Sequence, residues 1–355
     1  MVGVSRRSLL AAGLAVPALA GLGTRRAAAQ AAALRVGTWG GSWRDALDAN
    51  VIPKLPMPHP PIEYVLGNPD DNLAKLVVAR RQGQTPFDVW ECKPDEAANM
   101  VKANLLEPID FAQVPNAAVL PTWARASHHV FTISTQDGIV YNEQKFREAG
   151  LAPPTRYSDL NAPALRGHLA FPDLANPLHW NAVFGIAYEA GKDESDMSPV
   201  IPLVKALQPA YYFASSVDLA QKFGTGEIWA APWQTGYAIR LKRSGVPAAI
   251  AWPMFGSHRG AMLFTAVAAV HGTPNPAGAF SFINAYLSPE GQLGFCKATG
   301  VVPMNPAARR EMAKDPELAS MMLLDDAAIE NAFRVDWSRF DMKAWRERWT
   351  REIGA

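Results

Sequence analysis

Three tryptophans stand at or beside the ends of short apolar segments of this 355-residue chain. Trp39 follows the segment 34–38, and Trp90 and Trp233 close the segments 86–90 and 228–233. The face of an indole ring attracts ammonium groups through cation–π contacts. A tryptophan with a purely structural role more often lies within a helix or strand face, so we interpret these three as candidates for a ligand cleft. Packing in the core is the alternative for each.

The sequence lacks the motifs that would indicate catalysis. It contains no Gly-x-Ser-x-Gly elbow, no His-Glu-x-x-His, no phosphate loop ending in Gly-Lys-Ser/Thr and no dinucleotide glycine fingerprint. His128 and His129 are adjacent, so on a strand their rings point to opposite faces and joint metal ligation is awkward. We therefore expect a binding protein rather than an enzyme, with no metal and no cofactor.

Short apolar segments alternate with turn residues and helical stretches. Residues 34–38 alternate apolar and polar side chains as a strand does, and Gly40-Gly41-Ser42 then precedes a helical stretch. The same plan recurs at residues 86–90, 138–142, 168–172 and 228–233. This order predicts an α/β fold with largely parallel sheets. Ligands of such sheets bind beyond the carboxyl ends of the strands, so the loops after these segments form the expected site.

The first 29 residues are predicted to be an export signal. Arg6 and Arg7 precede an apolar run of about 14 residues and the small-residue site Ala27-Ala28-Ala29. Ser5 before the arginine pair and Leu9-Leu10 after it resemble the twin-arginine consensus, which prefers Phe where Leu9 stands. An ordinary Sec signal is the alternative. The run is shorter than the roughly 20 residues of a membrane-spanning helix. We therefore expect a periplasmic protein whose mature chain has no membrane span.

Length and charge constrain the mature chain further. Removing residues 1–29 takes away four arginines and no acid, so the formal net charge falls from +1 to −3 and nucleic acid is not an expected partner. The remaining chain of about 325 residues exceeds what one hydrophobic core usually supports, so two lobes are expected. Cys92 and Cys296 allow one disulfide or two buried thiols, and both options stay open. We expect a monomer.

Six segments, in order along the chain, carry a family resemblance. They are residues 36–41 (Val-Gly-Thr-Trp-Gly-Gly), 87–89 (Phe-Asp-Val), 138–142 (Gly-Ile-Val-Tyr-Asn), 157–160 (Tyr-Ser-Asp-Leu) leading to Arg166-Gly167, 223–227 (Phe-Gly-Thr-Gly-Glu) and 287–292 (Leu-Ser-Pro-Glu-Gly-Gln). Together they resemble the solute-binding proteins of ABC importers, of the spermidine/putrescine type, over nearly the whole mature chain. The resemblance implies a hinged periplasmic binding protein of the type II kind, which closes around a solute and signals to the permease of an ABC importer.

The resemblance also implies how the chain divides between the lobes. Crossings are expected near residues 136, 258 and 306. Lobe 1 then comprises residues 30–135 and 258–305, and lobe 2 comprises residues 136–257 and 306–355. Each lobe is expected to contain a central, mostly parallel sheet.

In this family the pocket is built from loops that follow strands. The matching positions here are Trp39, Gly40, Trp90, Glu91, Asp173, Asn176, His179, Trp180, Trp233, Gln234, Arg259 and Gly260. Polyamine receptors have an aromatic-then-Asp element where this chain has residues 257–262, and they have an acidic pair where it has Asp173 followed by neutral residues. One acid remains, Glu91 is a second candidate, and Arg259 is suited to an anion.

The mixed charge of this set favours a small charged organic solute with one amino end and one carboxylate, although amine and polyamine-like solutes remain within the prediction. A receptor for a carboxylate or other anion is an alternative. An exported α/β enzyme is a less favoured one, and a receptor that signals rather than transports is another.

Overall fold

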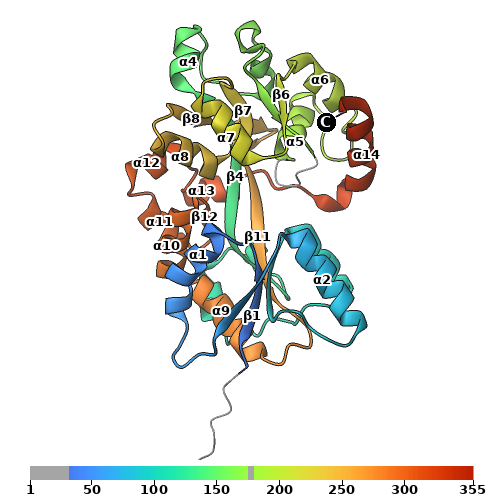
Figure 1. Ribbon diagram of the computed structural model, residues 1–355, viewed down its shortest axis with the longest axis vertical. Coiled ribbons are helices and arrows are strands. Elements are labelled where there is room, and N and C mark those ends of the chain that lie inside the picture. The colour runs from blue at the N-terminus through green and yellow to red at the C-terminus, as the bar shows by residue number, and fades with distance from the viewer. Residues whose placement is uncertain (1–31, 175–179, 355) are drawn as a thin grey trace, which may run out of the picture.

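The computed structural model describes residues 32–174 and 180–354, and it has two lobes joined at a waist (Figure 1). The predicted leader and the candidate residues Asn176 and His179 lie outside the described residues. The strands are β1 (Leu34–Thr38), β2 (Ile62–Leu66), β3 (Val89–Cys92), β4 (Val130–Asn142), β5 (Ala170–Pro172), β6 (Tyr211–Phe213), β7 (Ala230–Gln234), β8 (Ala248–Ala251), β9 (Met254–Phe255), β10 (His258–Arg259), β11 (Ala261–Ala269) and β12 (Val302–Pro303).

Helices cover the strands in both lobes. They are α1 (Ser42–Asn50), α2 (Pro69–Arg81), α3 (Pro94–Lys102), α4 (Glu143–Glu148), α5 (Asn181–Glu189), α6 (Val200–Leu207), α7 (Ser216–Gly224), α8 (Thr235–Arg243), α9 (Pro276–Tyr286), α10 (Pro289–Thr299), α11 (Pro306–Met312), α12 (Pro316–Met321), α13 (Asp326–Glu330) and α14 (Met342–Ile353). Short 3-10 helices include η4 (Tyr157–Asn161). In Figure 1 the lower lobe contains α1, α2, α9 and β1, and the upper lobe contains α4 to α8 and α14.

The α/β two-lobed fold is confirmed, but the main sheet is mixed rather than mostly parallel. β1 pairs in parallel with β2 and β3, whereas β11 runs antiparallel to β3 and β4, and β4 runs antiparallel to β7 and β8. β5 and β6 form a separate parallel pair. The difference arises at the waist, because β4 and β11 both cross it in opposite directions and pair with each other there (Figure 1).

Local sequence signals fix several helix ends. The side chain of Ser288 accepts a hydrogen bond from the backbone of Gly291 and caps α10, as the sequence predicts. Proline occupies the first turn of α3, α9 and α10, where its missing N–H is tolerated. Trp345 and Trp349 lie four residues apart on α14 and are both buried, which confirms the predicted apolar face of this helix.

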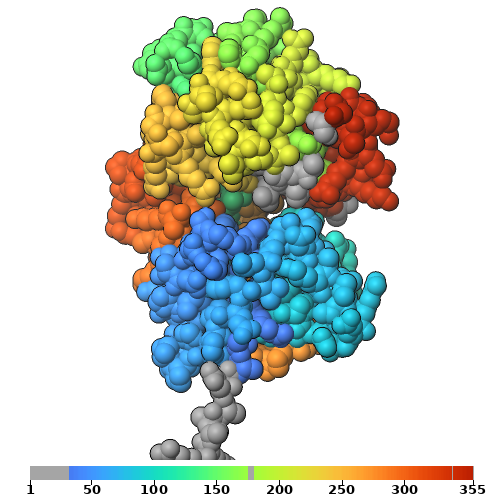
Figure 2. Space-filling view, viewed as in Figure 1, coloured from blue at the N-terminus to red at the C-terminus, as the bar shows by residue number. Residues whose placement is uncertain are grey.

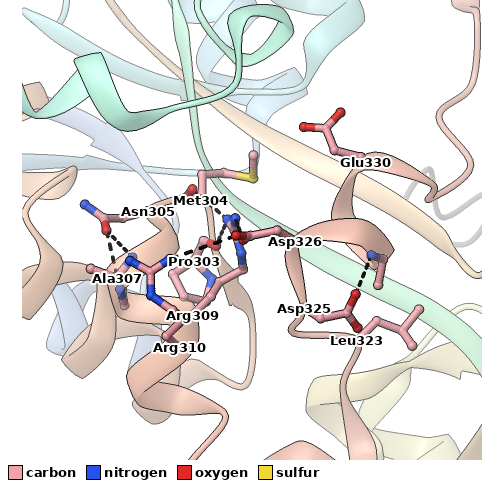
Figure 3. Close-up of polar contacts among 12 residues, drawn as sticks. Pro303, Met304, Asn305, Ala307, Arg309, Arg310, Leu323, Asp325, Asp326 and Glu330 are labelled. Atoms are coloured by element: carbon pink, nitrogen blue, oxygen red, sulfur yellow. Dashed lines mark hydrogen bonds and ion pairs between the residues drawn. The ribbon is translucent and has the colours of Figure 1, made fainter.

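The C-terminal helices brace the waist from one side. Arg309 of α11 is 2% exposed and donates to the carbonyl oxygens of Pro303 (3.1 Å) and Met304 (2.7 Å) and to the Asp326 carboxylate (2.5 Å), as Figure 3 shows. Gln136 of β4 makes a two-bond pair with the backbone of Leu323, through its amide nitrogen (2.6 Å) and oxygen (2.9 Å). The segments that cross the waist are therefore tied to α11–α13 by buried polar contacts.

Cys92 and Cys296 are both free and buried. Of the two options that the sequence left open, a disulfide or two buried thiols, the structure therefore has the two buried thiols. Figure 2 shows the blue and cyan surface of the lower lobe beneath the yellow surface of the upper lobe, with orange segments beside the waist.

Candidate functional site

A cavity of about 250 Å³ lies between the lobes, and we call it the interlobe cavity. The lower lobe, the upper lobe and the strands that cross the waist all contribute to its wall. It is lined by Trp39, Ser42, Trp43, Cys92, Lys93, Thr135, Gln234, Gly236, Tyr237, Arg240, Leu263, Phe264, Thr265, Thr299, Gly300 and Val301. A site with walls from both lobes changes shape when the lobes move, which suits a binding protein that closes on its ligand.

Aromatic rings face this cavity from both lobes. Trp39 and Trp43 stand at the start of α1 with ring centroids 5.0 Å apart, edge to face. On the upper lobe Tyr237 lies over Trp233, with centroids 4.7 Å apart and nearly parallel rings. The guanidinium carbon of Arg240 lies 4.9 Å from the Tyr237 ring centroid, within cation–π distance. The two lobes thus present flat apolar surfaces with one cation beside them.

Two helices begin at the cavity without a side-chain cap. α1 follows Gly41, whose φ of 61° is in the left-handed region that glycine adopts readily, and α8 follows Gln234. Neither residue caps its helix through a side-chain hydrogen bond. The first backbone N–H groups of a helix lack partners within the helix and carry partial positive charge, so they favour negatively charged groups.

The fixed charges at the wall are positive. Lys93 is held by Asp70 and Glu96, each with an oxygen 3.1 Å from its Nζ, so its charge is matched. Arg240 donates a long hydrogen bond of 3.4 Å to the carbonyl of Thr299 and forms no ion pair with any residue that the structure describes. Arg240 is therefore available to a ligand anion.

Glu91 lies one layer behind the aromatic wall. Its side chain accepts hydrogen bonds from the Trp43 indole (3.0 Å) and from the Thr38 hydroxyl, and its other oxygen has no hydrogen-bond partner among the described residues. Burial raises the pKa of Glu91 to about 7, and the hydrogen bonds from Thr38 and Trp43 oppose this rise in part. Glu91 holds Trp43 in place rather than lining the cavity itself.

Asp137 of β4 occupies a comparable position toward the upper lobe. Asn181, the first residue of α5, donates to one of its oxygens, and the other oxygen has no partner among the described residues. Burial raises the pKa of Asp137 to about 7, and the Asn181 hydrogen bond opposes this rise in part.

The structure brings together only some of the residues that the sequence pointed to. Trp39 and Gln234 line the interlobe cavity, and Gly40 is exposed directly after Trp39. Trp90 and Trp180 are instead buried in the two lobes, packed against Phe87 and Phe340.

The remaining candidates lie elsewhere. Trp233 is 1% exposed, because Tyr237 and Phe223 cover its two faces, so it supports the wall from behind. Asp173 is half-buried just after β5 and does not line the cavity. Arg259 is exposed on the β9–β10 hairpin, and Gly260 packs beneath Leu323 and Trp252.

Sequence reasoning missed Trp43, Tyr237 and Arg240. Trp43 follows the Gly40-Gly41 break at once, and Tyr237 and Arg240 are three residues apart on α8, on the face that begins after Gln234. Extending each candidate loop into the first two turns of the following helix would have found them.

The fold and the cavity together define a two-lobed solute-binding protein. The chain belongs to the family of bacterial extracellular solute-binding proteins, whose model matches residues 60–320. No curated protein gives a significant match.

Solved structures share the fold over nearly the whole chain. An ABC transporter protein of Clostridium perfringens is 24% identical with a TM-score of 0.72, and the match covers 90% of this chain and 99% of that one. The binding protein AgtB of Agrobacterium tumefaciens, solved with agropinic acid, is 20% identical with a TM-score of 0.67, covering 92% and 99%. A GABA receptor is 20% identical with a TM-score of 0.69, covering 91% and 95%.

None of the helices in the described part of the chain could span a membrane, since none is both long and apolar enough. Nor do three or more His, Cys, Asp or Glu side chains gather there in a way that could hold a metal ion.

Proposed function

We propose that this chain is a periplasmic receptor that binds a small organic solute with a carboxylate group in the interlobe cavity and delivers it to the permease of an ABC importer. Arg240 carries the proposal, because it lines the cavity and forms no ion pair with a described residue. Guanidinium–carboxylate hydrogen bonds are among the strongest in proteins. The uncapped starts of α1 and α8 add to the same preference.

The aromatic wall supports an amino group on the same solute. Ring faces attract ammonium groups, and Trp39, Trp43 and Tyr237 line the cavity beside Arg240. Two proteins of similar fold bind GABA and agropinic acid, and both ligands carry a carboxylate. An amino-acid-like solute uses both features. Spermidine and putrescine, the ligands of the family type that the sequence resembles, have no carboxylate and would leave Arg240 unpaired.

The test is a binding screen of residues 30–355 against amino acids, γ-aminobutyrate, dicarboxylates and polyamines by thermal shift and calorimetry. A ligand at a hundred times its Kd stabilises the folded protein by about 2.7 kcal/mol. We expect hits that carry a carboxylate, and Arg240→Gln should weaken each of them at least about tenfold, because a charge-assisted bond is lost.

Arg243→Gln is the matched control, since Arg243 lies on the same helix but binds Glu317 at 3.2 Å. Stabilisation by polyamines alone, or unchanged affinity in Arg240→Gln, would refute the proposed ligand class. Turnover of a hit would refute the role of a receptor without catalysis.

We infer that the lobes close by bending at the waist, with residues 30–135 and 258–305 moving against residues 136–257 and 306–355. The pairing of β4 with β11 and the contact of Gln136 with Leu323 support this assignment, because both lie where the chain passes between the lobes. Small-angle scattering should show a smaller radius of gyration with ligand than without it. An unchanged radius at saturation would contradict the closure.

We further propose that residues 1–29 direct twin-arginine export and that the mature protein is a monomer. Cell fractionation of the wild type and of an Arg6→Lys, Arg7→Lys variant tests the export route, and we expect only the variant to stay in the cytoplasm. Light scattering of the purified mature chain tests the oligomeric state. Periplasmic delivery of the variant would indicate a Sec signal instead.

A further inference from the structure

A second cavity lies within the upper lobe, away from the interlobe cavity. Its volume is about 610 Å³, and residues of η4, α5, α6 and β9 line its walls. It shares no lining residue with the interlobe cavity. Ligand pockets usually fall between about 300 and 1,000 Å³, so this upper-lobe cavity is large enough for an organic molecule.

Aliphatic side chains form most of its wall. Ile186 of α5 and Leu207 of α6 are buried at its base, whereas Leu203 and Met254 are 41% and 44% exposed at its rim. Large apolar side chains that remain this exposed around one cavity mark a surface that gains free energy when an apolar group covers it.

One glycine allows close packing at the floor of the cavity. The Tyr157 ring lies across α5 at Gly185, where a Cβ would be 2.1 Å from the ring, so only glycine allows this packing. Tyr157 is 1% exposed as a result. The backbone of η4 is fixed in turn by Glu189, whose carboxylate accepts hydrogen bonds from the N–H groups of Tyr157 and Ser158 (2.9 Å for Ser158).

The rim has one cation and one acid. Glu189 is the acid, and both of its oxygens are already bonded to the backbone of η4. Asp159, close by, accepts hydrogen bonds from the backbone N–H groups of Thr155 and Arg156 through one oxygen. Burial opposes the effect, but these hydrogen bonds and the nearby charge of Arg156 lower the pKa of Asp159. The cation is Arg156, which is exposed and forms no ion pair with a residue in the described ranges. Of the two charged groups that line the cavity, Arg156 is therefore the one whose hydrogen-bonding groups are available to a ligand.

We propose that the upper-lobe cavity is a second ligand site, which takes an amphipathic carboxylate with its aliphatic chain on Leu203, Leu207 and Met254 and its carboxylate at Arg156. The chain covers the exposed apolar rim, and the carboxylate gives the Arg156 guanidinium a charged partner. Because the walls all belong to one lobe, this site does not depend on closure of the interlobe cavity.

Calorimetry of residues 30–355 with octanoate tests the proposal, and octylamine, with the same chain length and opposite charge, is the comparison ligand. We expect octanoate to bind at least tenfold more tightly than octylamine. Arg156→Gln should weaken octanoate roughly tenfold through loss of a charge-assisted hydrogen bond. Ala206→Trp, at an exposed position of α6, should fill the cavity and abolish binding.

The controls separate this site from the interlobe cavity. Arg166→Gln removes an exposed arginine of the same lobe that does not line the cavity and should bind octanoate like the wild type. Thermal unfolding should show that every variant is folded. The proposal is overturned if octanoate does not bind, if octylamine binds equally well, or if Arg240→Gln weakens octanoate while Arg156→Gln does not. The last result would place octanoate between the lobes.

Discussion

Replacing Glu91 with glutamine tests how a buried carboxyl group makes stability depend on pH. Glu91 is 1% exposed, and burial raises its pKa to about 7. In the unfolded chain its pKa returns to roughly 4.3. Between these two values the folded protein keeps a proton that the unfolded chain has lost, so the free energy of unfolding falls as the pH rises. The fall approaches about 1.4 kcal/mol for each pH unit within that window.

From pH 5 to pH 7 this linkage removes about 2 kcal/mol from the stability of the wild type, allowing for partial ionisation at both ends. Glutamine has the same shape and can still accept the hydrogen bond of the Trp43 indole, but it does not titrate. We therefore expect the free energy of unfolding of Glu91→Gln to fall by about 2 kcal/mol less than that of the wild type over this range.

The assay is urea unfolding of the mature wild type and variant at pH 5, 6 and 7 and constant ionic strength. Glu63→Gln, at an exposed carboxylate of the same lobe, is the matched control and should follow the wild type. Parallel pH profiles for the wild type and Glu91→Gln would refute the reasoning, because they would show that Glu91 does not keep its proton in the folded state at pH 6.

Two further predictions concern the waist. Arg309→Met leaves the buried carbonyls that Arg309 binds without a donor and should lower the free energy of unfolding by about 1 to 3 kcal/mol. Arg310→Met, at a 68% exposed neighbour, should change it by less than about 0.5 kcal/mol, and equal effects in urea unfolding would contradict the buried role of Arg309. Gly300→Ala should destabilise by more than about 1 kcal/mol, because φ is 75° and a Cβ would lie 2.8 Å from another backbone atom. Gly354 has a similar φ of 76°, but an added Cβ there would lie in open space, so Gly354→Ala measures the cost of the backbone conformation without a steric clash. A Tm equal to that of Gly300→Ala would show that the close contact at the waist is unimportant.

The repeating order of strand, loop and helix was enough to predict an α/β fold and the strand ends that open onto the interlobe cavity. Trp39 and Gln234 follow from it directly, since each stands at a strand end that opens onto the interlobe cavity. The mixed sheet could not be predicted in the same way, because the partner of a strand is set by tertiary structure. β4 alone pairs with strands from four other parts of the chain.

The position of a residue at the end of a strand did not predict whether its side chain is buried or exposed. Trp233 ends a strand as predicted, yet it is covered by Tyr237, which lies one helical turn later. Exposure of a ring at a strand end depends on the start of the next helix. The first turn of α8 supplies Tyr237, which covers Trp233, and its second turn supplies the cation Arg240. An aromatic ring therefore does face the interlobe cavity beside Trp233, but it belongs to Tyr237 rather than to Trp233 itself.

The two buried carboxyl groups bear on which solute the interlobe cavity selects. Glu91 supports the wall on the lower lobe, and Asp137 lies on β4 toward the upper lobe, two residues from the lining residue Thr135. Burial raises the pKa of each to about 7, so below neutral pH both are largely uncharged. Neither then offsets the positive charge of Arg240 or the partial charges at the starts of α1 and α8. The same burial that lowers stability toward neutral pH thus supports the proposed preference of the cavity for a carboxylate over a polyamine, although two acids lie nearby.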